Sequence, residues 1–569
     1  MGLSARIAPR NPGAVDGRLP DVPVTSAPTA SAAAASGWSR RPISFARRLW
    51  HSGYRPALIA TAFAALLAWG FLLLPPMNTD LAAQLARADF ASRYPVSIID
   101  FRWFGGTVEY GYTLWASALM AHLGTKVTGA LAAVIGTWYT TRLLHRLKPA
   151  RPVLGGLAAA VTQVANVVEG RITFACGLAC GLIAVTLFTT TRVPRWLAVP
   201  LAVLFSLLCG GASPVAALLL WVAGAAALLL RRPVAAAVLI VPSGLAMAVT
   251  SVIFGDGGHQ PFTFADCLKS VTALAIVLAT VPRRCHPIRL GAGIGMVLLV
   301  AAFLLPTPVG SNATRLGLLF ALPVAASFVH WRNRILTALA LIAILALQLP
   351  VNPATIASTG RVSGYSAYYT VVSEEILSRG PLTGRVEVPE MAGHWDSVYL
   401  ARGVPLARGW LRQTDVRLND AVFYKRKPTP ASYRQFLIDN AVQYVAVPDA
   451  ELTRFGRDEL ALIATNLDYL SPIWRNAHWT LYEVHDFAPL VDPPARVLSQ
   501  QPDAIVVTVP ANSSIRVRLR WYRWLGMESQ DKQACIVQDG LYVTLHTGTG
   551  GNYTFNSRFP IGTGHCPKG

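Results

Sequence analysis

The sequence predicts a polytopic α-helical membrane protein that carries two modules outside the membrane at its C-terminal end. Three observations predict this class. Of the 569 residues, 53% are hydrophobic and only 14% are charged, with a mean hydropathy of +0.42, whereas about a quarter of the residues in soluble domains are charged. Apolar runs of membrane-crossing length recur as far as residue 350. Short alternating segments typical of strands then follow.

The N-terminal 50 residues are rich in Ala, Ser, Pro and Arg and lack the apolar pattern that builds a core. We therefore expect residues 1–50 to be a disordered, basic, cytoplasmic tail. The first apolar run begins near Ala57 and is followed by PPMNTD instead of a small-residue cleavage site, so it predicts a retained membrane helix and not a signal peptide.

The transmembrane domain is expected at residues 51–350. Arg-rich loops such as RLLHRLKPARP and VPRRCHPIR all fall on the cytoplasmic side if the tail is inside. For the same reason the net charge of +21 does not indicate nucleic-acid binding. An odd number of spans places everything after residue 350 outside the plasma membrane. The predicted spans are 57–75, 125–143, 152–168, 171–188, 196–210, 213–230, 233–253, 267–281, 289–305, 315–330 and 335–350.

The first external loop, residues 76–124, is long and is expected to carry two helices on the membrane surface. One is DLAAQLARADF, in which Leu81, Leu85 and Ala88 would meet the membrane. The other is GYTLWASALMAHLG, around residues 110–123. Counting this second stretch as a span would invert the later loops and place RLLHRLKPARP outside, against the basic-residue bias.

Two extracytoplasmic modules follow the membrane part. Residues 351–490 combine the strand-like RVEVPE and VQYVAVPD with the helical ASYRQFLIDNA, which predicts a mixed α/β domain. Residues 491–569 show β-rich alternation typical of a β-sandwich. Cys535 and Cys566 are the two cysteines of this last module, and an oxidising exterior favours a disulfide between them.

This organisation resembles the GT-C superfamily of membrane glycosyltransferases: a basic cytoplasmic start, an acid directly after the first span, a long first external loop and a β-rich external end. The composition and the Cys pair are similar to the arabinofuranosyltransferases of mycobacteria and related actinobacteria. DLAAQLARADF, WFGGTVEYGY and GHWDSVYLARGVPLARGWLRQTD also resemble an actinobacterial group of membrane proteins related to GT-C enzymes.

The resemblance implies a specific reaction. A sugar, such as arabinofuranose, would pass from a polyprenyl-phosphate donor to a cell-envelope polysaccharide on the outer face of the plasma membrane. The implied partners are the lipid-linked donor, the polysaccharide acceptor and the lipid bilayer, without nucleic acid.

Asp80 is the candidate catalytic base, because it follows the first span at the outer rim of the membrane, where a lipid-linked sugar projects. On a continuous helix Gln84 and Arg87 share its face, whereas Asp89 lies about half a turn away. This spacing favours an inverting transfer with a single base over a retaining mechanism with two close carboxylates. The alternative is that Asp80 is an ordinary helix-start acid, with Asn78 or Thr79 as the cap.

The donor phosphate is assigned to Arg171, Arg315 and His259, because the predicted outer surface is otherwise poor in cations. Arg171 has an alternative role in an ion pair with Glu169, and Arg315 in anchoring a helix at the interface. No cofactor is firmly predicted, and the site has no assigned metal. A divalent cation between Asp256 and His259 is the alternative use of the glycine-rich loop FGDGGHQPF.

Substrate-binding residues are assigned from acids, amides and aromatics suited to a sugar ring, although buried aromatics also serve as core or as membrane anchors. The sequence leaves open whether Asp89 or Asp256 contributes. Two other function classes stay open: a transporter or flippase of lipid-linked sugars, and a non-catalytic, membrane-anchored glycan-binding assembly protein. The assigned substrate-binding residues are Gln84, Trp103, Glu109, Tyr110, Glu169 and Trp395.

Overall fold

The computed structural model describes residues 54–255, 257–329, 333–558 and 562–567, and residues 54–569 form one compact unit. The predicted disorder of residues 1–50 and the candidate ligand Asp256 lie outside the described residues.

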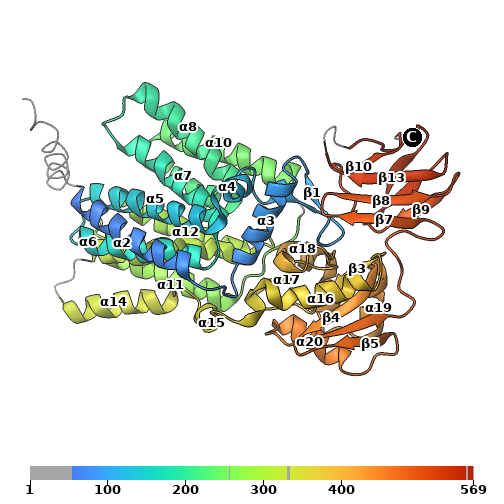
Figure 1. The fold of residues 1–569 in the computed structure, drawn as a ribbon. Coiled ribbons are helices and arrows are strands. Elements are labelled where there is room, and N and C mark those ends of the chain that lie inside the picture. The colour runs from blue at the N-terminus through green and yellow to red at the C-terminus, as the bar shows by residue number, and fades with distance from the viewer. Residues whose placement is uncertain (1–53, 256, 330–332, 559–561, 568–569) are drawn as a thin grey trace, which may run out of the picture. The chain divides into compact units, whose positions relative to one another are not determined.

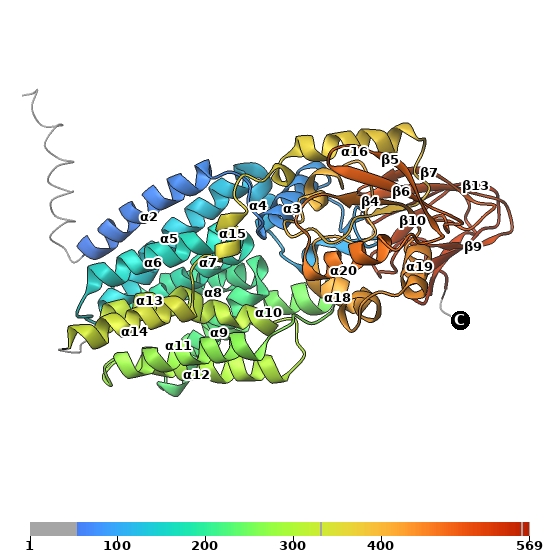
Figure 2. The same cartoon turned by 90° about the horizontal axis from the view of Figure 1, so that it is seen from below.

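Each of the eleven predicted apolar runs forms a helix, and these helices pack side by side (Figures 1 and 2). Small residues allow the close approach, as where Gly156 lies against Ala60 and Thr141. The helices are α2 (Arg55–Leu73), α5 (Thr125–Arg146), α6 (Pro152–Val168), α7 (Ile172–Thr189), α8 (Arg195–Ala212), α9 (Pro214–Leu229), α10 (Pro233–Ala248), α11 (Phe264–Thr280), α12 (His286–Leu304), α13 (Arg315–Phe328) and α14 (Arg334–Leu347).

Among the described residues, five helices are both long and apolar enough to cross a membrane: α2, α7, α8, α12, and α10 together with the π-helical turn η2 (Val249–Ile253). Three further apolar helices, α6, α9 and α14, are shorter. The chain is therefore a multi-pass membrane protein, and the number of eleven spans stays a prediction.

A sharp bend separates α4 (Ala116–Leu123) from α5. The two helices meet at Gly124, whose φ is +84°, and their axes differ by 112°. Together they make a sixth span only if counted as one broken segment. The stretch 110–123 thus does not continue α5 as a straight membrane helix.

The helix α3 (Leu81–Arg93) is not the surface helix that we expected. Eight of its 13 residues are buried, including the polar Gln84 and Arg87. The expectation was wrong because its alanines let α3 pack closely against α4, α5, α7 and α17 (Asp396–Tyr399). Leu81 and Ala88 accordingly contact protein and not lipid.

The rest of the long segment between α2 and α5 reaches into the terminal module. Its hairpin consists of β1 (Ile99–Asp100) and β2 (Thr107–Val108), followed by the turn η1 (Glu109–Gly111). Ile99, Phe101 and Val108 are buried in the core of that module. The Phe101 N–H donates to the carbonyl of Pro502 at 2.8 Å. Residues from the membrane domain therefore complete the core of the C-terminal module.

The segment after the membrane helices folds around a four-stranded sheet of order β3-β4-β6-β5, in which only the β3–β4 pair is parallel. Its strands are β3 (Arg385–Glu387), β4 (Val442–Pro448), β5 (Leu470–Arg475) and β6 (Trp479–Val484). Its helical elements are α15 (Pro353–Ala357), η4 (Val362–Gly364), α16 (Ser366–Ser378), α17, α18 (Arg412–Asn419), η5 (Asp420–Tyr424), α19 (Pro430–Asp439) and α20 (Arg454–Ile463).

Two antiparallel sheets form the terminal module, in the orders β10-β13-β8-β7 and β11-β12-β9. Their alternating apolar residues share one core. A disulfide joins Cys535 and Cys566, whose Cα atoms lie 4.8 Å apart. The strands are β7 (Arg496–Gln501), β8 (Ala504–Val509), β9 (Ser514–Val517), β10 (Gly526–Glu528), β11 (Cys535–Asp539), β12 (Tyr542–His546) and β13 (Gly551–Asn556).

The start of α3 lies directly against the loop between α6 and α7. Gly170 in this loop has a φ of +77°, and a Cβ placed on it would lie 2.0 Å from the backbone nitrogen of Leu81. The Asp80 N–H donates to the carbonyl of Glu169 at 3.3 Å. Only glycine allows this approach, because it lacks a Cβ and adopts positive φ readily.

We predict that Gly170→Ala destabilises the protein by at least ~3 kcal/mol, from positive-φ strain together with the backbone clash. Gly360→Ala is the matched control: its φ is +71°, but the atom nearest to a Cβ at this position would be 3.8 Å away. The control should lose only ~1–2 kcal/mol, from strain alone. Thermal unfolding in detergent measures the stability of both variants. Equal losses of stability would contradict the close approach of Gly170 to the start of α3.

Candidate functional site

Asp80 lies between α2 and α3 on a segment that several partners hold in place. The carbonyl of Pro76 accepts a hydrogen bond from the Gly360 N–H at 2.9 Å, and that of Met77 accepts one from the Trp395 indole N–H at 3.2 Å. The Asn78 N–H donates to the Ser358 hydroxyl at 2.9 Å. The position of Asp80 is therefore set both by the α6–α7 loop and by the part of the chain after residue 350.

The Asp80 side chain does not cap the helix that follows it. No side-chain hydrogen bond to the first turn of α3 is present, and the Thr79 hydroxyl accepts from the Leu81 N–H instead, at 3.2 Å. Within the described part of the chain, no side chain forms a hydrogen bond or ion pair with this carboxylate. Asp80 is half-buried: part of its surface is accessible, although protein packs closely around it. The Thr79 hydroxyl is thus bonded at the start of α3, as the helix-start alternative expects of Asn78 or Thr79, whereas the Asp80 carboxylate takes no part in capping.

Two arginines provide the charge opposite Asp80. Desolvation by the surrounding protein raises the pKa of the Asp80 carboxyl above its usual value, and the charges of Arg171 and Arg315 oppose this rise. Arg171 immediately precedes α7, and Arg315 begins α13. The three residues come from separate segments of the chain, and only the tertiary fold brings them together.

Arg315 lies against the first turn of α7, the helix that directly follows Arg171. The Arg315 guanidinium lies 4.7 Å from the centre of the Phe174 ring, and Phe174 is in the first turn of α7, just after Arg171. Arg171 and Arg315 are close enough to repel each other. With one acid facing two cations, the cluster carries net positive charge and is suited to an anion.

Tyr112 is a site residue that sequence reasoning missed. Its hydroxyl accepts a hydrogen bond from the Gln84 amide at 3.2 Å, and it interacts with Arg315. The Arg87 guanidinium lies 4.2 Å from the centre of the same ring. The only available signal was its place as the last residue of WFGGTVEYGY, a stretch in which Tyr110 is the tyrosine assigned to the sugar. Gln84 is thereby brought to the Asp80 cluster, as its spacing in α3 predicted.

Glu109 lies behind this cluster in a buried ion pair with Arg87, at 3.0 Å. Burial raises the pKa of the Glu109 carboxyl, with Arg87 opposing the rise. The second oxygen of Glu109 and the Nε of Arg87 are both buried without a partner. The Arg87 member of this pair packs against the Tyr112 ring. The pair makes no described contact with Asp80.

The proposed Glu169–Arg171 ion pair does not form. A Glu169 carboxylate oxygen accepts instead from the Asn352 backbone N–H at 2.7 Å, and no described residue forms an ion pair with Arg171. Glu169 therefore fastens the start of the external part to the α6–α7 loop. Arg171 is left facing the Asp80 cluster.

Three predicted sugar-binding aromatics lie elsewhere. Trp103 is fully buried, with the backbone of Gly409 against its ring. Trp395 is buried and stacks on Tyr399, with ring centres 5.7 Å apart. Tyr110 packs on Phe254, in contact with the terminal module. Trp103 and Trp395 are thus buried core side chains, and Tyr110 packs toward the terminal module.

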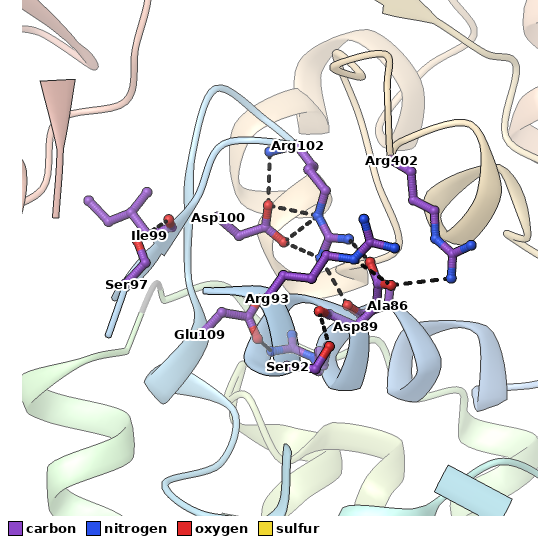
Figure 3. Close-up of polar contacts among 11 residues, drawn as sticks. Ala86, Asp89, Ser92, Arg93, Ser97, Ile99, Asp100, Arg102, Glu109 and Arg402 are labelled. Carbon is purple, nitrogen blue, oxygen red and sulfur yellow. Dashed lines mark hydrogen bonds and ion pairs between the residues drawn. The ribbon is translucent and has the colours of Figure 1, made fainter. Parts of the chain in front are cut away.

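Asp89 belongs to a separate ionic cluster, shown in Figure 3. Its carboxylate contacts Arg93 at 3.2 Å, Arg102 at 3.4 Å and Arg402 at 3.2 Å. Arg102 in turn binds the buried carboxylate of Asp100 at 2.7 Å. These contacts join α3 to the β1–β2 hairpin and to the external part, so Asp89 fastens elements together instead of pairing with Asp80.

His259 is exposed on the loop between η2 and α11. The cations that act on the Asp80 carboxyl are Arg171 and Arg315, and His259 is not among them. Its predicted partner Asp256 is outside the described residues. Among those residues, no group of three His, Cys, Asp or Glu side chains is arranged to hold a metal ion.

No protein-family model matches the chain, and no curated protein matches it in sequence. Solved structures with a similar arrangement include the arabinofuranosyltransferase AftD from Mycobacteria, at 15% identity and a TM-score of 0.41, over 81% of this chain and 41% of that one. A mutant form of AftD gives 17% identity and a TM-score of 0.44 over 76% and 42%. ArnT from Cupriavidus metallidurans gives 13% identity and a TM-score of 0.34 over 75% and 97%.

AftD is named an arabinofuranosyltransferase, the kind of enzyme that the sequence resembles. The chain spans less than half the length of the AftD chains. At this identity and these TM-scores the similarity is one of general arrangement, and it does not carry the neighbours' activities over to this chain.

We predict that Asp80→Asn raises the thermal stability at neutral pH. The pKa of Asp80 is higher in the folded state than its unfolded value of 3.8. Above pH 3.8 the folded protein therefore holds the proton on Asp80 more tightly than the unfolded chain does. The parent protein therefore loses stability as the pH rises from 3.8 through the raised folded pKa. The asparagine variant has no such loss, so its advantage should grow over this pH range in detergent melts.

The control is Asp89→Asn, the same change on the same helix. Asp89 contacts three arginines, so its loss should destabilise the protein by about 1.5–3 kcal/mol. Destabilisation by both variants would show that Asp80 is a structural acid.

Proposed function

We propose that this protein is a GT-C-type membrane glycosyltransferase that uses a polyprenyl-phosphate sugar donor, with Asp80 as its base. The observation that carries the proposal is the Asp80 carboxylate, which has no side-chain partner among the described residues and faces Arg171 and Arg315. A structural acid beside two arginines would be expected to form an ion pair. Because the Asp80 carboxylate does not pair with either arginine, a substrate group has room to bind between the acid and the two cations.

The reaction follows from these positions. Asp80 would accept the proton of an acceptor hydroxyl as its oxygen attacks the anomeric carbon of the donor sugar. The bond from that carbon to the phosphate oxygen breaks, its electron pair stays on the phosphate, and the configuration inverts. Arg171 and Arg315 would bind the leaving polyprenyl phosphate as its negative charge increases. The raised pKa of Asp80 strengthens it as a base.

A single base is supported by the contacts of two other acids of this region, Asp89 and Glu109. Asp89 is held by three arginines, and Glu109 is paired with Arg87. Neither is free to act as a nucleophile beside Asp80, as a retaining double displacement requires. Gln84 and Tyr112 are the neutral polar groups of the cluster, and we assign them to the sugar or its phosphate.

The orientation we propose places Asp80 outside the cell. The loops at the other end of the helices carry the Arg clusters that the positive-inside rule assigns to the cytoplasm. The external face is also where an envelope polysaccharide would be extended. An arabinofuranosyl donor is the sugar that the sequence resemblance favours. Transport of a lipid-linked sugar and a non-catalytic assembly role are the competing functions.

Asp80→Asn is predicted to lower the transfer rate by about 10²–10⁴-fold, the usual contribution of a general base. The assay uses the purified protein, a polyprenyl-phosphoarabinofuranose and an arabinan acceptor. Asp266→Asn is the control, because Asp266 is likewise an acid at the start of a helix, but it is exposed and bonded to the cap Thr263. Unchanged transfer by the Asp80 variant would reject the base, and donor flux across vesicles without transfer would favour a transporter.

Arg171→Gln and Arg315→Gln are predicted to lower kcat/KM for the donor by about 10²–10³-fold each, because each removes a charge from the leaving phosphate. The lysine variants retain charge and should recover part of this loss. Arg361→Gln is the control, since it breaks only an exposed ion pair with Glu451. A donor kcat/KM that is unchanged in both glutamine variants would remove the phosphate assignment.

A further inference from the structure

A large cavity lies inside the helical domain, toward the end away from Asp80. Its volume is about 1000 Å³, and its walls are mainly apolar residues of α7, α9, α10, α11, α12 and α13. Leu182, Leu220 and Phe320 are among these walls. The volume is at the upper end of the range for small-molecule sites. The cavity is therefore large enough for hydrocarbon chains.

One end of this cavity is basic. Its described lining includes Arg142 and Arg146 from the end of α5, Arg192 from the α7–α8 loop, Arg232 from the start of α10 and His286 from the start of α12, and it includes no acid. We call these five residues the basic rim. The other described lining side chains are apolar or hydroxyl-bearing. A cluster of positive charge next to an apolar cavity is complementary to an amphipathic anion.

Two of the rim arginines are brought together on one aromatic ring. The guanidinium of Arg142 lies 3.9 Å from the centre of the Tyr54 ring, and that of Arg192 lies 4.8 Å from the same centre. Arg146 is fixed by hydrogen bonds to the Thr186 carbonyl and the Thr189 hydroxyl. Arginines from the end of α5 and from the α7–α8 loop are thus positioned close to one another although their charges repel.

We propose that this cavity binds an anionic glycerophospholipid, with its phosphate at the basic rim and its acyl chains along the apolar walls. The rim lies at the opposite end of the 22-residue helix α5 from the α3–α4 region, a rise of about 33 Å. A lipid bound here belongs to the leaflet opposite Asp80 and is separate from a donor whose phosphate lies at Arg171 and Arg315. Its phosphate would connect the ends of α5, α7, α10 and α12, which supply the rim residues.

The test uses the full chain in nanodiscs of phosphatidylcholine that contain a minor fraction of phosphatidylglycerol. After extraction in mild detergent, the retained lipids are counted by native mass spectrometry. We expect the parent protein to retain phosphatidylglycerol in preference to phosphatidylcholine. Arg192→Gln combined with Arg232→Gln should lower this preference by roughly tenfold or more.

The matched control is Arg195→Gln combined with Arg231→Gln, which removes the same charge from arginines near the rim that do not line the cavity. This control should keep the preference. A second pair tests the walls: Ala223→Phe fills the cavity and should abolish retention, whereas Ala225→Phe, on the same helix but outside the lining, should not. Melting curves establish that each variant is folded.

Three results would overturn the proposal. They are equal lipid preference in the two arginine variants, retention that Ala223→Phe leaves unchanged, and displacement of phosphatidylglycerol by an equimolar polyprenyl phosphate. The last result would assign the cavity to the lipid carrier of the sugar. All three outcomes are independent of transfer activity, so the proposal can fail while the role of Asp80 stands.

Discussion

The close approach of α3 to the loop between α6 and α7 is the constraint on which the rest of the structure depends. With no side chain at Gly170, the backbone at Asp80 and Leu81 lies directly on that loop. The contact brings Asp80, which directly precedes α3, toward Arg171, which follows the glycine. It also lets α3 enter the protein interior, where its polar face contacts Tyr112 and Glu109.

The acids near this contact differ in how far neighbouring groups stabilise their negative charge. Asp89 is surrounded by arginines that stabilise its carboxylate, and it links three elements. Glu109 is buried beside one arginine. Asp80 is desolvated and has no side-chain hydrogen bond to any described residue, although two cations act on it from a distance. Its charge thus lacks the paired arginine that Asp89 and Glu109 each have, which suits the proposed role of an available base.

The external part and the membrane domain are built as one unit at this site. Trp395 and Ser358 form hydrogen bonds with the backbone of the segment before Asp80. The Glu169 carboxylate accepts a hydrogen bond from the Asn352 backbone N–H. The β1–β2 hairpin of the first loop completes the core of the terminal sandwich. A deletion of the module that carries Trp395 and Ser358 would therefore disturb the backbone before Asp80. Trp395, selected from the sequence as a sugar contact, has this positioning role in the structure.

The sequence by itself determined the helices of the membrane part, the strands of the external part and the candidate acid and cations, because hydropathy, periodicity and charge bias are local properties. It also identified Gln84 as a neighbour of Asp80, since helical spacing fixes that relation. Only the tertiary structure decided that α3 is buried, that Tyr112 joins the cluster, and that Trp103 and Trp395 face the protein core. These outcomes depend on contacts between residues far apart in the chain, and no local pattern records which neighbour will cover a given face.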